Sequence, residues 1–287
     1  MKINKVVIPV AGWGTRSLPA SKNIPKEMLP VFNKPVIQYV VEEAIRAGIQ
    51  DVVFVTSKEK RVIEDHFDYT PQLEETLERA GKMDLHKEVR AVGEMINVIS
   101  VRQKKQLGLG HAVLCAKEVV CNQPFGVILG DDMIIGQDAG IIQLIEAAQK
   151  YNMPAVGVME VPNDKVSRYG IVSGQEIAPG ILRIDKMVEK PKPEEAPSNL
   201  AIVGRYVLTP DIFWHIENGE RGHGGEIQLT DALQKLASDG GMLAVKIKGL
   251  RFDAGDWAEY LTANIYFALQ DDTLRDDLLE QLRPLVK

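Results

Sequence analysis

The chain has 287 residues, a length that suits one large α/β domain or two small ones. Its hydrophobic fraction of 45% and charged fraction of 26% are ordinary for a globular protein with a sizeable core. Lys and Arg number 34 against 40 Asp and Glu, so the formal net charge is -6. This balance argues against nucleic acid or an anionic membrane as partner, because both require a basic face.

The N-terminal segment leads directly into a short apolar strand, so we expect no secretion signal. The two cysteines, Cys115 and Cys121, are expected to be free, buried thiols, as in proteins of a reducing compartment. Nor is there an apolar run long enough to span a bilayer. Together these features predict a cytoplasmic protein without a membrane partner.

Short runs rich in β-branched residues alternate with amphipathic stretches, which indicates a largely parallel sheet covered by helices. A helix is predicted over 33–48, with Asn33 as its N-cap and Gly48 closing it. Residues 72–92 are predicted to be a charged helical pair inserted between strands. The expected strands are 5–10, 51–56, 97–102, 125–130 and 155–161.

After residue 160 the strand-like segments come closer together, with Pro and Gly between them. This change predicts a smaller β-rich region over 161–256, laid on the main sheet of residues 1–160. Residues 257–287 look helical and are expected to serve in packing or self-association. We expect these three parts to form a single domain over 1–287.

The stretch "VAGWGTRSLPASKNIPKEMLP" follows the first strand and concentrates glycine with cations. Gly12 and Gly14 let backbone N–H groups approach an anion closely, and Arg16 and Lys26 supply a bidentate fork and a point charge. The loop matches neither the dinucleotide fingerprint nor the Walker loop. A purely structural turn is the alternative. The added cations favour a polyphosphate site.

"FGVILGDD" ends a buried strand with two adjacent carboxylates, Asp131 and Asp132. Ligands gather at the carboxyl ends of strands in open α/β sheets. Oxygen ligands of this kind suit Mg²⁺, although helix capping or a surface turn explains the pair equally well. The five histidines show no grouping typical of zinc, and His111 is expected to be a helix-start residue.

Several separated blocks, in order along nearly the whole chain, resemble the nucleotide-sugar pyrophosphorylases. "PKEMLP" is similar to the motif of the bacterial UTP–glucose-1-phosphate uridylyltransferases in particular. The resemblance implies a Rossmann-like, mixed and mostly parallel central sheet flanked by helices, of the nucleotide-diphospho-sugar transferase type. The other blocks are "VRQKKQLGLGHAV", "ILGDD", "YGIV", "VEKPKPEEAPSNLAIVGRYVLTPDIF", "GGEIQLTDAL" and "RFDAGDWAEY".

The resemblance also assigns roles to individual residues. It implies that Arg16, Lys26 and Lys190 are catalytic and that Asp131 and Asp253 hold Mg²⁺. Asp132 and the unusual Trp13 receive no defined role. The implied nucleotide-binding residues are Ala11, Gly12, Gly14, Glu27, Gln103 and Gly108, and the implied sugar-binding residues are Gly170, Glu189, Lys190 and Val203.

The reaction that the resemblance implies is transfer of UMP from UTP to glucose 1-phosphate, giving UDP-glucose and pyrophosphate. The attacking phosphate is already an anion, so positioning and charge neutralisation would suffice for catalysis. The same chemistry with dTTP or another sugar phosphate is an alternative. A non-catalytic regulatory paralogue is another, although Arg16 and Lys26 are both present. The resemblance further implies a homodimer or homotetramer.

Overall fold

The computed structural model describes residues 1–138 and 140–285, so residues 286–287 of the expected C-terminal segment lie outside the described part. The described strands are β1 (Lys5–Pro9), β2 (Pro30–Val31), β3 (Lys34–Pro35), β4 (Asp51–Thr56), β5 (Asn97–Arg102), β6 (Phe125–Ile128), β7 (Asp132–Ile135), β8 (Ala155–Glu160), β9 (Gly170–Ala178), β10 (Ile181–Glu189), β11 (Leu200–Leu208), β12 (Leu243–Lys246) and β13 (Leu250–Asp253). The described α-helices are α1 (Val36–Arg46), α2 (Arg61–His66), α3 (Pro71–Arg79), α4 (Met83–Glu94), α5 (Leu109–Cys115), α6 (Lys117–Val120), α7 (Ile141–Tyr151), α8 (Asp211–Glu217), α9 (Leu229–Gly240), α10 (Trp257–Gln270) and α11 (Arg275–Leu282).

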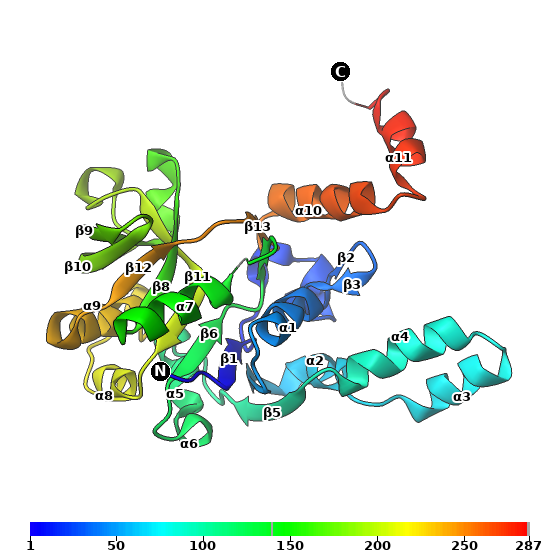
Figure 1. Ribbon diagram of the computed structural model, residues 1–287, viewed down its shortest axis with the longest axis horizontal. Helices are drawn as coiled ribbons and strands as arrows, with labels where there is room; N and C mark the ends of the chain where they lie inside the picture. Colours follow the sequence, from blue (N-terminus) through cyan, green and yellow to red (C-terminus); the bar gives the residue numbers. More distant parts are fainter. Residues whose placement is uncertain (139, 286–287) are drawn as a thin grey trace.

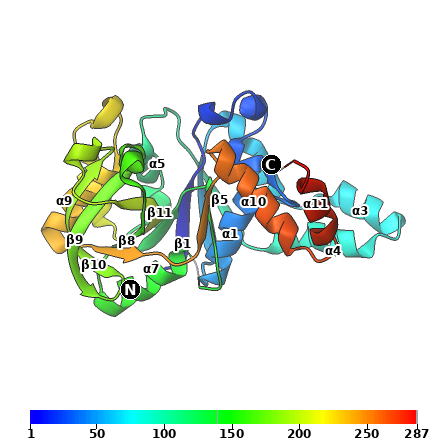
Figure 2. The same cartoon turned by 90° about the horizontal axis from the view of Figure 1, so that it is seen from above.

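One large mixed sheet organises the described residues, in the order β5-β4-β1-β6-β11-β8-β12-β10-β9. Strands β5, β4, β1 and β6 run parallel to one another, whereas β11 pairs antiparallel with both β6 and β8. The long antiparallel pair β9–β10 closes the other end of the sheet, away from the hairpin α3–α4 (Figures 1 and 2). The predicted mixed α/β fold with a β-rich second part is confirmed. The expected parallel pairing holds for β5-β4-β1-β6 and for β8–β12, whereas the other pairings in the second part are antiparallel because β11 and the hairpin β9–β10 run the opposite way to their neighbours.

Helices cover both faces of the sheet because its central strands are apolar on both sides. Val6, Ile8 and Phe54 face one core, which α1 and α7 complete. Val7 and Val53 face the other, which α5, α8 and α9 complete. Burying both faces of parallel strands is what fixes such a sheet inside the molecule. Among the described residues, no helix combines the length and apolar character needed to cross a membrane.

The start of the first helix differs from the prediction. Phe32, in the left-handed region at φ 55°, and Asn33 form the turn of the hairpin β2–β3. The helix therefore begins at Val36, with Pro35 rather than Asn33 at its N-cap. Gly48, at φ 79°, follows its end as predicted. The sequence gives no sign of this hairpin because each of its strands has only two residues.

The helical hairpin α3–α4 and the C-terminal helices α10 and α11 extend from the body of the molecule (Figure 1). Both segments are helical as predicted. Cys115 and Cys121 are free as expected, but Cys121 is exposed and Cys115 only partly buried, so the prediction of two buried thiols is wrong. Cys121 is the residue that follows the short helix α6.

Candidate active site

Two adjoining cavities open at the carboxyl ends of β1 and β6, the edge at which α/β proteins bind ligands. The larger has a volume of about 450 Å³ and the smaller about 180 Å³. They share Leu109, Leu129 and Asp131, so a ligand can run from one into the other. The larger is lined by Pro9, Ala11, Gly12, Trp13, Gly14, Thr15, Lys26, Glu27, Gln103, Gln106, Gly108, Ala112 and Glu226 besides the shared residues.

All six residues predicted to bind the nucleotide line the larger cavity. In the loop after β1, a Cβ atom added to Gly12 would meet nothing within 4 Å, so the backbone there is open to a ligand. Gly14 has φ 65°, a conformation that side chains rarely adopt, and begins a 3₁₀ turn containing Arg16. A Cβ at Gly14 would lie 3.3 Å from the Lys26 side chain. Glycine thus allows the loop to pack against this lysine.

Glu27 forms a buried ion pair beneath the larger cavity. Its Oε2 accepts a hydrogen bond from Lys60 Nζ at 2.9 Å, and both side chains are almost fully buried. Burial raises the pKa of Glu27 above its ordinary value, despite the opposing effect of Lys60 and Lys26. Sequence reasoning did not identify Lys60, because an isolated lysine in a charged turn is usually exposed. Glu27 is therefore held in one position by a partner from the start of α2.

Lys26 and Asp131 meet where the two cavities join, although 105 residues separate them in sequence. Burial alone would lower the pKa of Lys26, but Asp131 and Glu27 outweigh it and raise that pKa. Burial alone would raise the pKa of Asp131, but Lys26 and then Arg16 outweigh it and lower that pKa. The pair is thus charged, as a site for phosphate and cation requires.

Two further carboxylates, Asp132 and Asp253, lie beside Asp131 in the smaller cavity. Strand β13 pairs antiparallel with β7 and sets Asp253 opposite Asp132. Burial raises the pKa of Asp132 to about 6, and burial followed by repulsion from Asp131 raises that of Asp253. The site thus concentrates negative charge that favours a cation.

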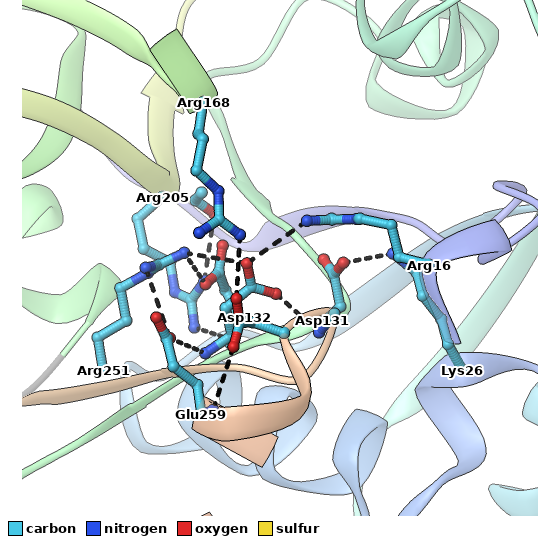
Figure 3. A network of polar contacts seen from close by, with 12 residues as sticks. Arg16, Lys26, Asp131, Asp132, Arg168, Arg205, Arg251 and Glu259 are labelled. Carbon is cyan, nitrogen blue, oxygen red and sulfur yellow. Dashed lines mark hydrogen bonds and ion pairs between the residues drawn. The ribbon is translucent and has the colours of Figure 1, made fainter. Parts of the chain in front are cut away.

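Arg251 lies against these carboxylates and was missed by sequence reasoning. Its guanidinium contacts Asp132, lies 3.9 Å from Asp253 Oδ2, and is also 3.9 Å from Glu259 Oε2 (Figure 3). Side chains alternate between the two faces of a strand, so Arg251 and Asp253, two residues apart, share one face of β13. This spacing was the sequence feature that could have placed Arg251 beside the metal carboxylates. Arg16 Nη1 also lies 3.9 Å from Asp253 Oδ2, and Figure 3 shows Arg16 and Arg251 on opposite sides of Asp131 and Asp132.

The smaller cavity holds the predicted sugar-binding residues Gly170 and Glu189. The pairing of β9 with β10 sets these two residues opposite each other. A Cβ atom at Gly170 would lie 2.9 Å from Thr230 Oγ1 and 3.1 Å from Glu189 Oε2, so glycine keeps this corner open. Thr230 donates a hydrogen bond of 2.6 Å to Glu189 Oε2, which leaves the other carboxylate oxygen for a ligand or for Lys190.

Two predicted sugar-site residues lie outside both cavities. Val203 is buried in the hydrophobic core, and its neighbours on β11, Ile202 and Gly204, line the smaller cavity instead. Successive side chains of a strand point to opposite faces of the sheet, so the Val203 side chain points away from the cavity. The prediction that this side chain belongs to the sugar site is therefore wrong. Lys190 follows β10 at φ 47°, with Nζ 3.6 Å from Glu189 Oε1. It lies beside the cavity rather than lining it.

Arg168 also lines the smaller cavity and was not predicted. Its Nη2 lies 3.1 Å from Asp256 Oδ2, and Asp256 caps the N-terminus of α10 (Figure 3). This ion pair connects the β-rich part of the chain to the C-terminal helix at the edge of the site. Nothing in the sequence singles out Arg168, because its partner is 88 residues away.

The carboxylates fit a magnesium ion. Mg²⁺ is usually held by one or two protein carboxylates together with substrate phosphates and water. Asp131 and Asp253 supply such oxygens in one cavity, beside the cations that would contact phosphate. Within the described residues, no three His, Cys, Asp or Glu side chains form a complete metal cage. Two carboxylates beside phosphate-binding cations suit a cation whose other ligands are phosphate oxygens and water.

Comparison with known proteins agrees with this geometry. The family model described as nucleotidyl transferase matches residues 5–269. A UTP–glucose-1-phosphate uridylyltransferase of Bacillus subtilis is 46% identical over 99% of this chain and 98% of its own length. A UTP-bound enzyme of Acinetobacter baumannii superposes with a TM-score of 0.90 at 40% identity, covering 100% of both chains. A UDP-glucose pyrophosphorylase complexed with UDP-glucose superposes with a TM-score of 0.85 at 42% identity, covering 94% of this chain and 100% of that chain. The resemblance stated from the motifs is confirmed, and this chain belongs to the nucleotidyl transferase family.

Proposed function

We propose that this protein transfers the uridylyl group from UTP to glucose 1-phosphate, giving UDP-glucose and pyrophosphate. A phosphate oxygen of glucose 1-phosphate attacks the α-phosphorus of UTP. The bond from that phosphorus to the oxygen bridging to the β-phosphate breaks, and pyrophosphate leaves with its electron pair. The observation that carries this proposal is the junction of the two cavities at Asp131, with Lys26 and Arg16 beside it.

Each residue has a distinct task in this proposal. The larger cavity takes the nucleoside, with Gln103 and the backbone of Ala11 and Gly12 facing the base. Lys26 contacts the α-phosphate, and Arg16 stabilises the charge that builds on the departing pyrophosphate. Catalysis then depends on holding two phosphates in line and neutralising their charge.

In the smaller cavity, Glu189 accepts hydrogen bonds from sugar hydroxyls and Gly170 offers backbone groups. Lys190 reaches over the rim to the incoming phosphate. Asp131 and Asp253 would hold Mg²⁺, which supplies charge neutralisation across the phosphates when bound. Lys26 donates a hydrogen bond to Asp131, which holds its ammonium group at the junction of the two cavities.

Turnover of the purified protein tests the proposal. We expect pyrophosphate release that requires UTP, glucose 1-phosphate and Mg²⁺ together. Labelled pyrophosphate exchange, run with four nucleoside triphosphates and several sugar 1-phosphates, separates the proposed reaction from that with dTTP or another sugar. Nucleotide binding without turnover would instead identify a regulatory paralogue.

We also propose that the protein acts in the cytoplasm as a homo-oligomer assembled through α10. Trp257, Leu261 and Ile265 recur every four residues on this helix, and all three are exposed. Such a continuous apolar stripe is typical of an interaction surface. Leu261→Asp should shift the mass measured by light scattering towards the monomer, whereas Leu73→Asp, at an exposed leucine of α3, should not. A monomeric wild-type protein would refute this assembly.

A further inference from the structure

The side chain of Gln103 is held in the larger cavity by two acceptors. Its Nε2 lies 3.2 Å from the carbonyl oxygen of Gly108 and 2.9 Å from Nδ1 of His111. Its backbone N–H donates to Thr56 at the end of β4, so main chain and side chain are both anchored. Gln103 is nearly fully buried and lines the cavity assigned to the nucleoside. These contacts determine which end of the amide a ligand can meet.

The chemistry of the two partners fixes the orientation of this amide. A backbone carbonyl only accepts hydrogen bonds, so the nitrogen of Gln103, and not its oxygen, must face Gly108. His111 Nδ1 faces the same nitrogen and must therefore accept as well. The ring is then neutral, with its proton on Nε2. Burial lowers the pKa of His111, which also favours the neutral ring.

This arrangement uses both N–H groups of the Gln103 amide. Among the described residues, none donates a hydrogen bond to its Oε1. The oxygen is thus the one polar atom of this side chain available to a ligand. An acceptor in this position can pair with uracil only at N3–H, because O2 and O4 on either side of N3 are acceptors too. Cytosine in the same place presents an unprotonated N3.

We propose that His111 is a positioning residue which, with the Gly108 carbonyl, holds the Gln103 amide oxygen toward the base and so selects uracil over cytosine. This inference rests on the proposed function for its ligand, a uridine nucleotide. His111 itself does not touch the base. Its effect is to prevent the amide from rotating, since a rotated amide would offer an N–H that pairs with N3 of cytosine.

The tautomer of His111 tests the inference without any turnover. In the ¹⁵N-labelled wild-type protein, two-bond nitrogen–proton correlation spectra report which ring nitrogen carries the proton. We expect an unprotonated Nδ1 and a proton on Nε2 at neutral pH. A proton on Nδ1 would overturn the inference, because that nitrogen could not then accept from Gln103.

Base selection is tested by binding rather than by catalysis. Calorimetric dissociation constants for UTP, 5-methyl-UTP and CTP are compared in wild type and in His111→Phe, which keeps a ring but removes the acceptor. We expect His111→Phe to reduce the preference for UTP over CTP by about tenfold, the value of one hydrogen bond. The preference between UTP and 5-methyl-UTP should not change, because both carry N3–H.

Two variants make the comparison specific. His111→Asn supplies an amide oxygen near the position of Nδ1 and should retain the UTP preference. Cys115 Sγ lies 4.0 Å from Nδ1 of His111. Cys115→Ala removes this thiol and leaves both Gln103 and His111 in place, so its UTP preference should equal that of the wild type. An unchanged UTP-to-CTP ratio in His111→Phe, or a wild-type protein that binds both equally, would refute the role of His111. Selective UTP binding without turnover would refute the proposed reaction alone.

Discussion

Replacing Arg16 by alanine separates a catalytic role from a structural one. The side chain is 59% exposed, and its ion pair with Asp253 is 3.9 Å long. Exposed ion pairs of this kind contribute about 0–1 kcal/mol to stability. The free energy of unfolding of Arg16→Ala, from urea denaturation, should therefore fall by less than about 1 kcal/mol.

The expected loss of activity is much larger. Arginines that neutralise charge in phosphoryl transfer are worth roughly 10³–10⁵ in kcat, or about 4–7 kcal/mol of transition-state stabilisation. Arg16 lines the smaller cavity near the proposed ligands of Mg²⁺, so it is placed for this task. We expect kcat for pyrophosphate release to fall by this factor, with stability nearly unchanged.

A matched control is Arg61→Ala. Arg61 is 79% exposed and pairs with Asp65 at 3.3 Å, and it lines neither of the two cavities. Its kcat should equal that of wild type. An Arg16→Ala protein that keeps more than about a tenth of wild-type kcat, a barrier change below roughly 1.4 kcal/mol, would refute the role given to Arg16.

Three further predictions concern the metal, the core and pH. Chelation should abolish turnover, and added Mg²⁺ should restore it. Asp253→Asn should raise the Mg²⁺ concentration needed for half-maximal activity at least about tenfold. Activity that persists in the presence of chelator would contradict the proposed metal site. The Arg205 guanidinium donates to both carboxylate oxygens of the buried Glu43, at 2.8 and 2.7 Å. Arg205→Met leaves this carboxylate buried without its partner, so the free energy of unfolding should fall by about 3–5 kcal/mol. A loss under about 1 kcal/mol in urea denaturation would contradict this reasoning. Burial lowers the pKa of His66 in the folded protein below its ordinary 6.5. The unfolded chain then binds more protons at this residue than the folded one, so His66 reduces the free energy of unfolding as the pH falls below 6.5. An NMR titration that gives His66 a pKa at or above 6.5 would contradict this direction of the pH dependence.

The local order of the chain is well predicted from the sequence. The strands at 51–56 and 97–102 have the bounds expected from their β-branched runs, and the helical pair predicted over 72–92 is present as α3 and α4, which extend from Pro71 to Glu94. Such elements depend on the spacing of apolar residues over a few positions, and this spacing can be read from the sequence alone. The hairpin β2–β3 was missed because strands of two residues have no period to detect.

The glycine loop and the carboxylates at the end of β6 were likewise identified from residue types at a strand end. All the predicted nucleotide and metal residues line one or both of the two cavities. What the resemblance could not decide was the direction of each side chain. Val203 shows this, because one step along β11 separates the core from the cavity.

The sequence by itself therefore determined the order of the elements and the kinds of group at each strand end. Only the tertiary structure decided which of those groups meet. Lys26 reaches Asp131 because β1 and β6 are neighbours in the sheet, and Arg251 reaches Asp132 because β13 pairs with β7. Contacts across such distances depend on strand order and register. These are properties of the whole core and are carried by no local pattern.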